Sequence, residues 1–238
     1  MWFQSTPAPL HFAVLLLSLP LRSTASPVSP LHHHQQRQQS QTCSLTSLTE
    51  AKLKCIAPSS NTCAGASFPD ECATASQALP NILHSFQTYK ITSWGEQAAI
   101  VSLMAFESDD FKYKKNHFPA PGRPGQGTRN MQSPTFNAKY AASIPALASK
   151  LPSASGDLAS VLNLLLSDEA YDFGSGAWFL STQCSKEVRS ALQSGSETGW
   201  TAYITQCVST TVTDARMEYW KRAVNALKPG GTAACSSA

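Results

Sequence analysis

The sequence predicts a mainly α-helical domain with a disulfide-rich N-terminal region. Three observations support this fold class. Apolar residues recur at helical spacing through most of the chain, the alternating pattern of β-strands is almost absent, and four of the seven cysteines lie between residues 43 and 72. The formal net charge of +3 is close to neutral, which argues against nucleic acid or an acidic membrane surface as the main partner.

The N-terminal residues have the pattern of an export signal. Residues 11–21 form an apolar run that is too short to span a bilayer, and Ser23-Thr24-Ala25 offers small residues for cleavage. We therefore expect a signal peptide over residues 1–25 and a secreted, extracellular protein. Residues 26–41 are rich in Gln, His and Pro and predict a disordered linker. No later segment is long and apolar enough to be a membrane anchor, so no membrane partner is expected.

One domain is expected over residues 42–230, with residues 42–74 as a cysteine-rich cap and residues 231–238 as a flexible tail. An oxidising compartment favours disulfides over metal thiolates, and no CxxC pair is present, so neither a metal site nor a cofactor is expected. We expect Cys184 to pair with Cys207. Cys235 is free or pairs with another chain, which gives a monomer with a covalent dimer through Cys235 as the alternative. Three pairings remain open among Cys43, Cys55, Cys63 and Cys72.

The first half of the domain contains two predicted helices and a long loop. A helix is expected from about Ala75 to Tyr89, interrupted early by Pro80. The segment Ser93-Trp94-Gly95-Glu96 is a capping-box sequence, so Glu96 has a structural role, and the following helix runs to Ser108. Residues 109–133 contain repeated Pro and Gly, and an irregular connection of this length is usually functional.

The second half of the domain is again predicted to be helical. Asp157 is expected to cap a helix over residues 158–166, and Ser175 or Gly176 to start a helix that runs toward Cys184. Further helices with suitable apolar spacing are expected around residues 136–142, 185–193, 198–208 and 213–227.

Glu107 is the leading candidate for chemistry. It closes a helix whose residues 98–106 are apolar nearly all the way round, the pattern of a helix buried in a core. A carboxylate in such surroundings is costly to ionise, which suits a general acid. The alternative is a carboxylate that solvent reaches at a helix end.

The order of Glu107-Ser108, a Gly-rich loop and then Gly127-Thr128-Arg129-Asn130-Met131-Gln132 resembles the lysozyme-like superfamily. It is most similar to goose-type lysozymes and lytic transglycosylases, which carry a catalytic Glu-Ser at the end of a core helix and a Gly-x-x-Met-Gln turn. Here one extra residue separates Gly from Met-Gln. The segment Pro121-Gly122-Arg123-Pro124-Gly125-Gln126 is more weakly similar to the Gly-Arg-Gly loop of family 19 chitinases. The chain also resembles secreted fungal proteins of this type.

The resemblance implies a lysozyme-like helical domain and a secreted glycoside hydrolase with a polysaccharide partner, peptidoglycan or chitin, cut at β-1,4-linked N-acetylhexosamines. Glu107 would be the general acid and Ser108 would orient it. The other substrate-binding residues would be Asn130, Met131 and Gln132 in the cleft, with Tyr140 and Tyr171 stacking on sugar rings. Core packing is the alternative role for both tyrosines.

The second carboxylate of a two-acid glycosidase is not evident. Inverting enzymes place it roughly 6.5–9.5 Å from the acid, and the nearest candidates, Asp109 and Asp110, would point away from Glu107 on a continuing helix. A mechanism with one protein acid therefore fits better, with the substrate's N-acetyl group assisting. The competing hypothesis is a non-catalytic cell-wall-binding or interaction protein on the same scaffold.

Overall fold

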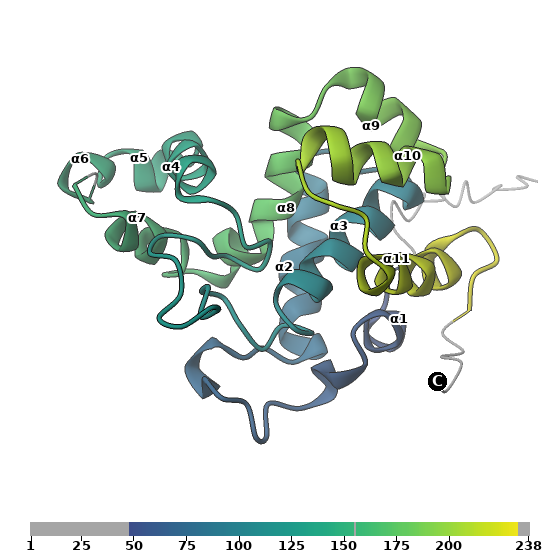
Figure 1. The fold of residues 1–238 in the computed structure, drawn as a ribbon, viewed down its shortest axis with the longest axis horizontal. Helices are drawn as coiled ribbons and strands as arrows, with labels where there is room; N and C mark the ends of the chain where they lie inside the picture. The colour runs from purple at the N-terminus through teal and green to yellow at the C-terminus, as the bar shows by residue number, and fades with distance from the viewer. Residues whose placement is uncertain (1–47, 155, 233–238) are drawn as a thin grey trace, which may run out of the picture. The chain divides into compact units, whose positions relative to one another are not determined.

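The computed structural model describes residues 48–154 and 156–232, and this part of the chain is mainly helical (Figure 1). The predicted mainly α fold class is therefore confirmed. The expected signal peptide, the linker, Cys43 and Cys235 lie outside the described residues, and the domain limits stay predictions. None of the described helices is long and apolar enough to cross a membrane.

The secondary structure consists of helices joined by loops and short turns. The α-helices are α1 (Glu50–Ile56), α2 (Ala75–Thr88), α3 (Trp94–Glu107), α4 (Pro134–Ser143), α5 (Pro145–Ala148), α6 (Leu151–Ala154), α7 (Leu158–Leu165), α8 (Glu169–Gln183), α9 (Lys186–Gln193), α10 (Glu197–Ala202) and α11 (Asp214–Leu227). The 3-10 turns are η1 (Pro58–Asn61) and η2 (Pro69–Glu71), and a π-helical turn, η3 (Tyr203–Cys207), continues α10.

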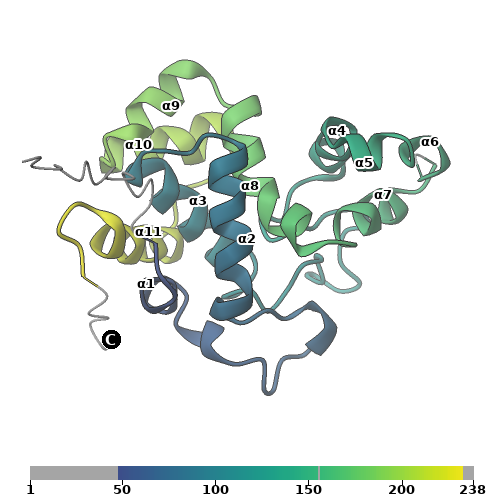
Figure 2. The same cartoon turned by 180° about the vertical axis from the view of Figure 1, so that it is seen from behind.

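The helices form two groups, each with a hydrophobic cluster of its own (Figures 1 and 2). The large group consists of α1, α2, α3, α9, α10 and α11, and the small group consists of α4 to α7. Helix α8 belongs to both clusters: Phe173, Ala177 and Leu180 pack in the large group, whereas Trp178 and Phe179 pack in the small group. This helix therefore joins the two groups.

Helix α3 is buried nearly all the way round, as its apolar sequence predicts. It begins after Ser93, whose hydroxyl accepts a hydrogen bond from the Glu96 amide at 3.1 Å. The fully buried Glu96 carboxylate contacts the Ser93 hydroxyl at 2.9 Å and pairs with Arg189 of α9. Glu96 thus has the structural role expected of it. The helix ends at Glu107, one residue earlier than predicted.

Two helices differ from the sequence prediction. Helix α2 is not interrupted by Pro80 but runs through it. Helix α8 begins at Glu169 rather than at Ser175 or Gly176, and the Asp168 side chain caps it by accepting from the Ala170 amide at 2.8 Å. The glycines in α8 are packing contacts rather than a start signal, because a Cβ at Gly174 would lie 2.5 Å from the hydroxyl oxygen of Tyr140.

Disulfides fix both halves of the described chain. Cys184, directly after α8, is bonded to Cys207 at the end of η3, the pairing that the sequence analysis preferred. Cys63 is bonded to Cys72, which selects among the pairings left open, and Cys55 is also disulfide-bonded.

Replacing Gly195 by alanine is expected to lower the free energy of unfolding by about 2 kcal/mol or more. Gly195 ends α9 with φ +67°, and an added Cβ would lie 2.0 Å from the Trp94 ring. Gly65 is the matched control, since its φ is +77° but an added Cβ would meet nothing within 4 Å. Denaturant unfolding of both variants separates the backbone cost from the clash. Equal losses in the two would contradict the predicted contact.

Candidate functional site

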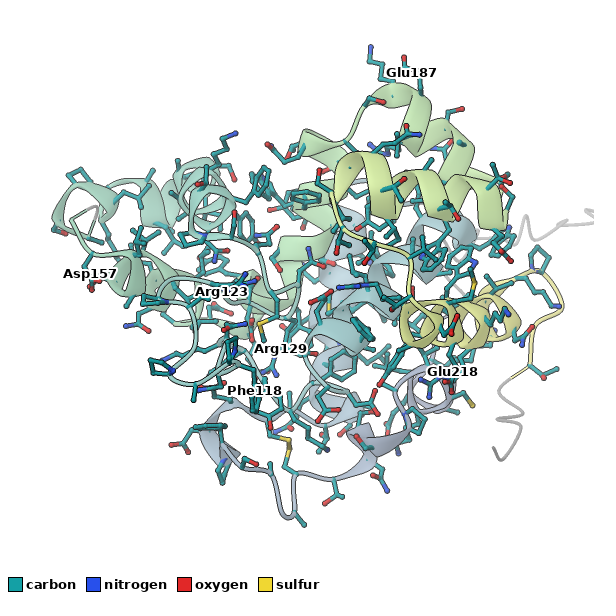
Figure 3. The ribbon with its side chains drawn as sticks, viewed as in Figure 1. Phe118, Arg123, Arg129, Asp157, Glu187 and Glu218 are labelled. Carbon is teal, nitrogen blue, oxygen red and sulfur yellow. A yellow bond between two sulfur atoms is a disulfide. The ribbon has the colours of Figure 1, made fainter. Side chains whose placement is uncertain are left out.

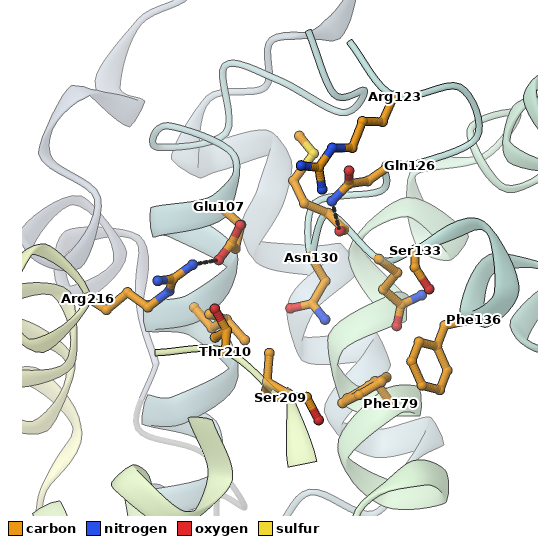
Figure 4. Close-up of a pocket in the computed structure, with 14 residues that line it drawn as sticks. Glu107, Arg123, Gln126, Asn130, Ser133, Phe136, Phe179, Ser209, Thr210 and Arg216 are labelled. Atoms are coloured by element: carbon orange, nitrogen blue, oxygen red, sulfur yellow. Dashed lines mark hydrogen bonds and ion pairs between the residues drawn. The ribbon is translucent and has the colours of Figure 1, made fainter. Parts of the chain in front are cut away.

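A cleft lies where the two helical groups face each other beside Glu107 (Figure 4). Its main cavity has a volume of about 460 Å³. The large group contributes the C-terminal end of α3 and the N-terminal turn of α11, and α4, α8, the loop after α3 and residues 208–210 complete the wall. The lining residues are Leu103, Glu107, Arg123, Gln126, Asn130, Met131, Gln132, Ser133, Phe136, Phe179, Val208, Ser209, Thr210 and Arg216.

A second cavity of about 440 Å³ adjoins the main cavity. The two cavities share Glu107, Gln126 and Met131, so these residues mark the junction between them. The other residues lining the second cavity are Phe106, Asp109, Tyr113, Lys115, Asn116, His117 and Phe118.

Near its end, the loop forms a small antiparallel turn that contains three of the predicted residues. Gly127 and Gln132 exchange both backbone hydrogen bonds, at 3.1 and 2.8 Å, and enclose residues 128–131. The Met131 amide donates to the Thr128 carbonyl at 2.9 Å. The extra residue noted in the sequence is thus accommodated in a closed four-residue turn, and this turn places Asn130, Met131 and Gln132 on the cleft wall.

Asp110 anchors the start of the loop. This carboxylate is buried and accepts hydrogen bonds from the Ser59 amide at 2.8 Å and from the Tyr219 hydroxyl at 2.9 Å. Asp110 therefore anchors the loop and lines neither cavity. Asp109 is exposed and lines the second cavity.

Arg129, in the closed turn near the end of the loop, connects that turn to the start of the loop and to α8, and Figure 3 shows it inside the fold. Its Nε donates to the Asp172 carboxylate of α8 at 2.8 Å, and its Nη1 donates to the Phe111 carbonyl at 2.7 Å. Arg129 and Asp172 are 1% and 2% exposed, so this is a buried ion pair. Burial raises the pKa of the Asp172 carboxyl, and the charge of Arg129 opposes that rise.

Of the two interpretations left open for Glu107, an enclosed acid and a carboxylate that solvent reaches, its partial exposure favours the second. Its side chain is 22% exposed, and its Oε1 accepts a hydrogen bond from Arg216 Nη2 at 2.9 Å (Figure 4). The Arg216 guanidinium also stacks over the Phe106 ring, 4.6 Å from its centroid. Tyr203 is fully buried nearby; burial, and then the charge of Glu107, raise the pKa of its hydroxyl. Glu107 is thus a paired carboxylate at the edge of a cavity.

Asn130 presents a hydrogen-bonding amide opposite Glu107. Figure 4 shows its side chain pointing into the main cavity between Glu107 and Ser133. Its Oδ1 is enclosed, without a partner among the described residues, and a Cβ at Gly176 of α8 would lie 3.4 Å from that oxygen. The amide nitrogen is therefore the group that Asn130 offers to a ligand. Gln132 is held by Asn137, whose Oδ1 accepts from Gln132 Nε2 at 3.2 Å.

The structure brings four of the predicted site residues together and separates three. Glu107, Asn130, Met131 and Gln132 line the main cavity, whereas the other three line neither cavity. Ser108 is fully buried, and its hydroxyl donates to the Met104 carbonyl at 2.7 Å. The Tyr140 hydroxyl donates to the Tyr171 carbonyl at 3.0 Å, and the Tyr140 ring packs on Trp178. The packing role left open for Tyr140 is the one seen.

Several residues that line the cleft were not predicted from the sequence. Arg216 is the most important, because it pairs with Glu107 from 109 positions away in the chain. No local sequence pattern predicts the contact between Arg216 and Glu107. Nine further residues of the cavity wall were also not among the predicted site residues: Leu103, Arg123, Gln126, Ser133, Phe136, Phe179, Val208, Ser209 and Thr210.

No protein-family model matches the chain, and no solved structure matches it significantly. The chain is similar to a curated protein of Fusarium oxysporum (strain Fo5176), a bifunctional dioxygenase–epoxy alcohol synthase. The two are 49% identical over 156 residues, which cover 63% of this chain and 12% of the relative. The chain therefore spans about an eighth of that relative's length.

This relative overturns the lysozyme-like interpretation. It is named for dioxygenase and epoxy alcohol synthase activities, and not for glycoside cleavage. The expectation of a glycosidase that acts on peptidoglycan or chitin is therefore wrong. The alternative, a cell-wall-binding protein, is not supported either. The resemblance depended on the short Glu-Ser and Met-Gln motifs, and the placement of a few residues does not define a reaction.

Dioxygen chemistry in proteins is carried by cofactors such as haem, flavin, copper or iron, and sites for single metal ions are formed by groups of His, Cys, Asp or Glu side chains. Within residues 48–154 and 156–232, no three or more His, Cys, Asp or Glu side chains are grouped so that they could hold a metal ion. The five cysteines of these ranges are in disulfides. His84 is exposed, and His117 Nε2 bonds to Glu71 at 3.0 Å. These residues do not form a metal site with three or more protein ligands.

Proposed function

We propose that the chain is a ligand-binding domain whose cleft takes an epoxy alcohol, the class of compound in the name of its relative. The observation that carries the proposal is the main cavity, where the Glu107 carboxylate, held by Arg216, lies opposite the Asn130 amide beside an apolar wall. No oxygen-activating step is assigned to the described residues, which contain no group of three or more possible metal ligands.

The polar groups of the cavity complement those of an epoxy alcohol. An epoxide oxygen only accepts hydrogen bonds, whereas a hydroxyl group both donates and accepts. The Asn130 amide nitrogen supplies a donor for the epoxide oxygen. Glu107 supplies an acceptor for the hydroxyl, since its Oε2 has no hydrogen-bond partner among the described residues while Oε1 is held by Arg216. The ion pair keeps this acceptor in a fixed position.

The apolar wall complements the carbon skeleton. Five side chains supply it: Leu103, Met131, Phe136, Phe179 and Val208. The Phe136 and Phe179 rings meet edge to face with centroids 4.9 Å apart, so this part of the wall is already packed before a ligand arrives. Apolar surface that a ligand buries there contributes roughly 25 cal/mol per Å².

Replacing Asn130 by leucine is expected to weaken the binding of glycidol, the smallest epoxy alcohol, about fivefold, the effect of about one neutral hydrogen bond. Wild-type affinity for so small a compound is expected on the order of millimolar. Titration followed by amide chemical shifts in NMR measures both. Asn163→Leu is the control, because Asn163 is exposed on α7 and lines neither cavity. Absence of saturable binding to the wild type, or equal affinity in both variants, would refute the proposal.

A further inference from the structure

The second cavity differs from the main cavity in having a wall that is rich in rings. Phe106, Tyr113, His117 and Phe118 contribute to it, together with the Met131 thioether. Phe118 is the most exposed of the large apolar side chains that the structure describes, at 64%. Phe118 and Tyr113 meet edge to face with centroids 5.9 Å apart. Such rings favour contact with flat or apolar groups.

The ring wall is held rigid from outside the cavity. His117 stacks on Phe68 with centroids 3.7 Å apart, and the Glu71 carboxylate bonds to His117 Nε2 at 3.0 Å. The other oxygen of Glu71 accepts from the amides of Lys114 and Lys115, each at 3.1 Å. Both Phe68 and Glu71 lie in the segment closed by the Cys63–Cys72 disulfide. A wall ordered in advance costs little further entropy when a ligand binds.

We propose that the second cavity is the subsite for an apolar, flat substituent on the epoxide, so that one ligand extends across both cavities. The inference rests on the proposed function, which places the epoxy alcohol group in the main cavity. Glu107 and Met131 line both cavities, so a ligand seated at the Glu107 carboxylate reaches the ring wall by passing over the Met131 side chain. The two cavities then divide the ligand into a polar part and an apolar part.

The test compares two compounds that differ only in this substituent, glycidol and 3-phenylglycidol, by the same titration. The wild type is expected to bind 3-phenylglycidol at least tenfold more tightly, because the phenyl ring buries apolar surface. Phe118→Ser is expected to remove most of that gain and to leave the affinity for glycidol unchanged. Leu158→Ser is the control, an exposed apolar residue on α7 that lines neither cavity.

The outcomes separate the two proposals. If glycidol binds and the phenyl group adds no affinity, or if Phe118→Ser and Leu158→Ser lose the same amount, the subsite is wrong and the proposed function stands. If neither compound binds the wild type, the proposed function fails and the subsite with it. Amide shifts at residues 113–118 caused only by 3-phenylglycidol would support the subsite directly.

Discussion

Replacing Arg129 by methionine is expected to lower the free energy of unfolding by about 3–5 kcal/mol, which is the largest single effect predicted for this chain. The substitution leaves the Asp172 carboxylate buried without its cation, and Asp172 Oδ1 already has no hydrogen-bond partner among the described residues. It also removes the donor to the Phe111 carbonyl, which holds the start of the loop. Urea unfolding followed by circular dichroism measures the loss.

The loss in Arg129→Met should depend on pH with a definite sign. Burial raises the pKa of Asp172 above the 3.8 of an exposed aspartate, and the opposing charge of Arg129 is absent in the variant. The unfolded chain ionises Asp172 at a lower pH than the folded protein does, so the folded state binds more protons. The variant should therefore become less stable as the pH rises above about 4.

Two further variants check this interpretation. Arg129→Met combined with Asp172→Leu should recover much of the lost stability, because no buried charge then remains unpaired. Lys54→Met removes a half-exposed helical ion pair with Glu50 and should change stability by about 0.5 kcal/mol or less. A loss in Arg129→Met as small as that in Lys54→Met would show that the buried pair contributes little.

Removing the Cys184–Cys207 disulfide by replacing both residues with alanine is expected to cost about 3 kcal/mol. The bond closes a loop with a sequence separation of 23, and both cysteines pack against the two hydrophobic clusters. Residues 208–210, which line the main cavity, follow Cys207 directly. The variant should therefore also bind glycidol more weakly than the wild type, and thermal unfolding together with the titration tests both effects.

The other disulfide supplies the matched comparison. The Cys63–Cys72 bond has a sequence separation of 9, so its removal should cost somewhat less stability, since the shorter loop restricts the unfolded chain less. It should leave glycidol binding unchanged, because neither cysteine lines the main cavity. A larger loss from this pair, or equal effects on glycidol binding, would contradict the assigned roles.

The sequence predicts those features that depend on neighbouring residues. The cap at Ser93, the cap at Asp157 and the burial of α3 follow from short patterns, and all three are found in the structure. The start of α8 was placed too late, at Ser175 or Gly176, although Gly174 and Gly176 lie inside the helix where an added Cβ would meet distant side chains. A packing contact of that kind leaves no mark in the local sequence.

The candidate site shows the same division. Glu107 and the residues 130–132 stand out in the sequence because one ends an apolar helix and the others follow a Gly-rich loop. Arg216 and Arg129 do not stand out, because their partners Glu107 and Asp172 lie 109 and 43 positions away. Without Arg216 the sequence suggests an enclosed acid. Because Arg216 pairs with it, Glu107 is a hydrogen-bond acceptor rather than the proton donor that the sequence suggests.

The membership of α8 in both hydrophobic clusters sets a limit on what the cleft accepts. Phe173 and Leu180 bind this helix to one cluster, and Trp178 and Phe179 bind it to the other, so the cleft cannot widen unless one of the clusters loses contacts. The distance between the walls of the cleft is then fixed by the packing of α8. A thin compound would then fit between these walls more easily than a bulky, branched one.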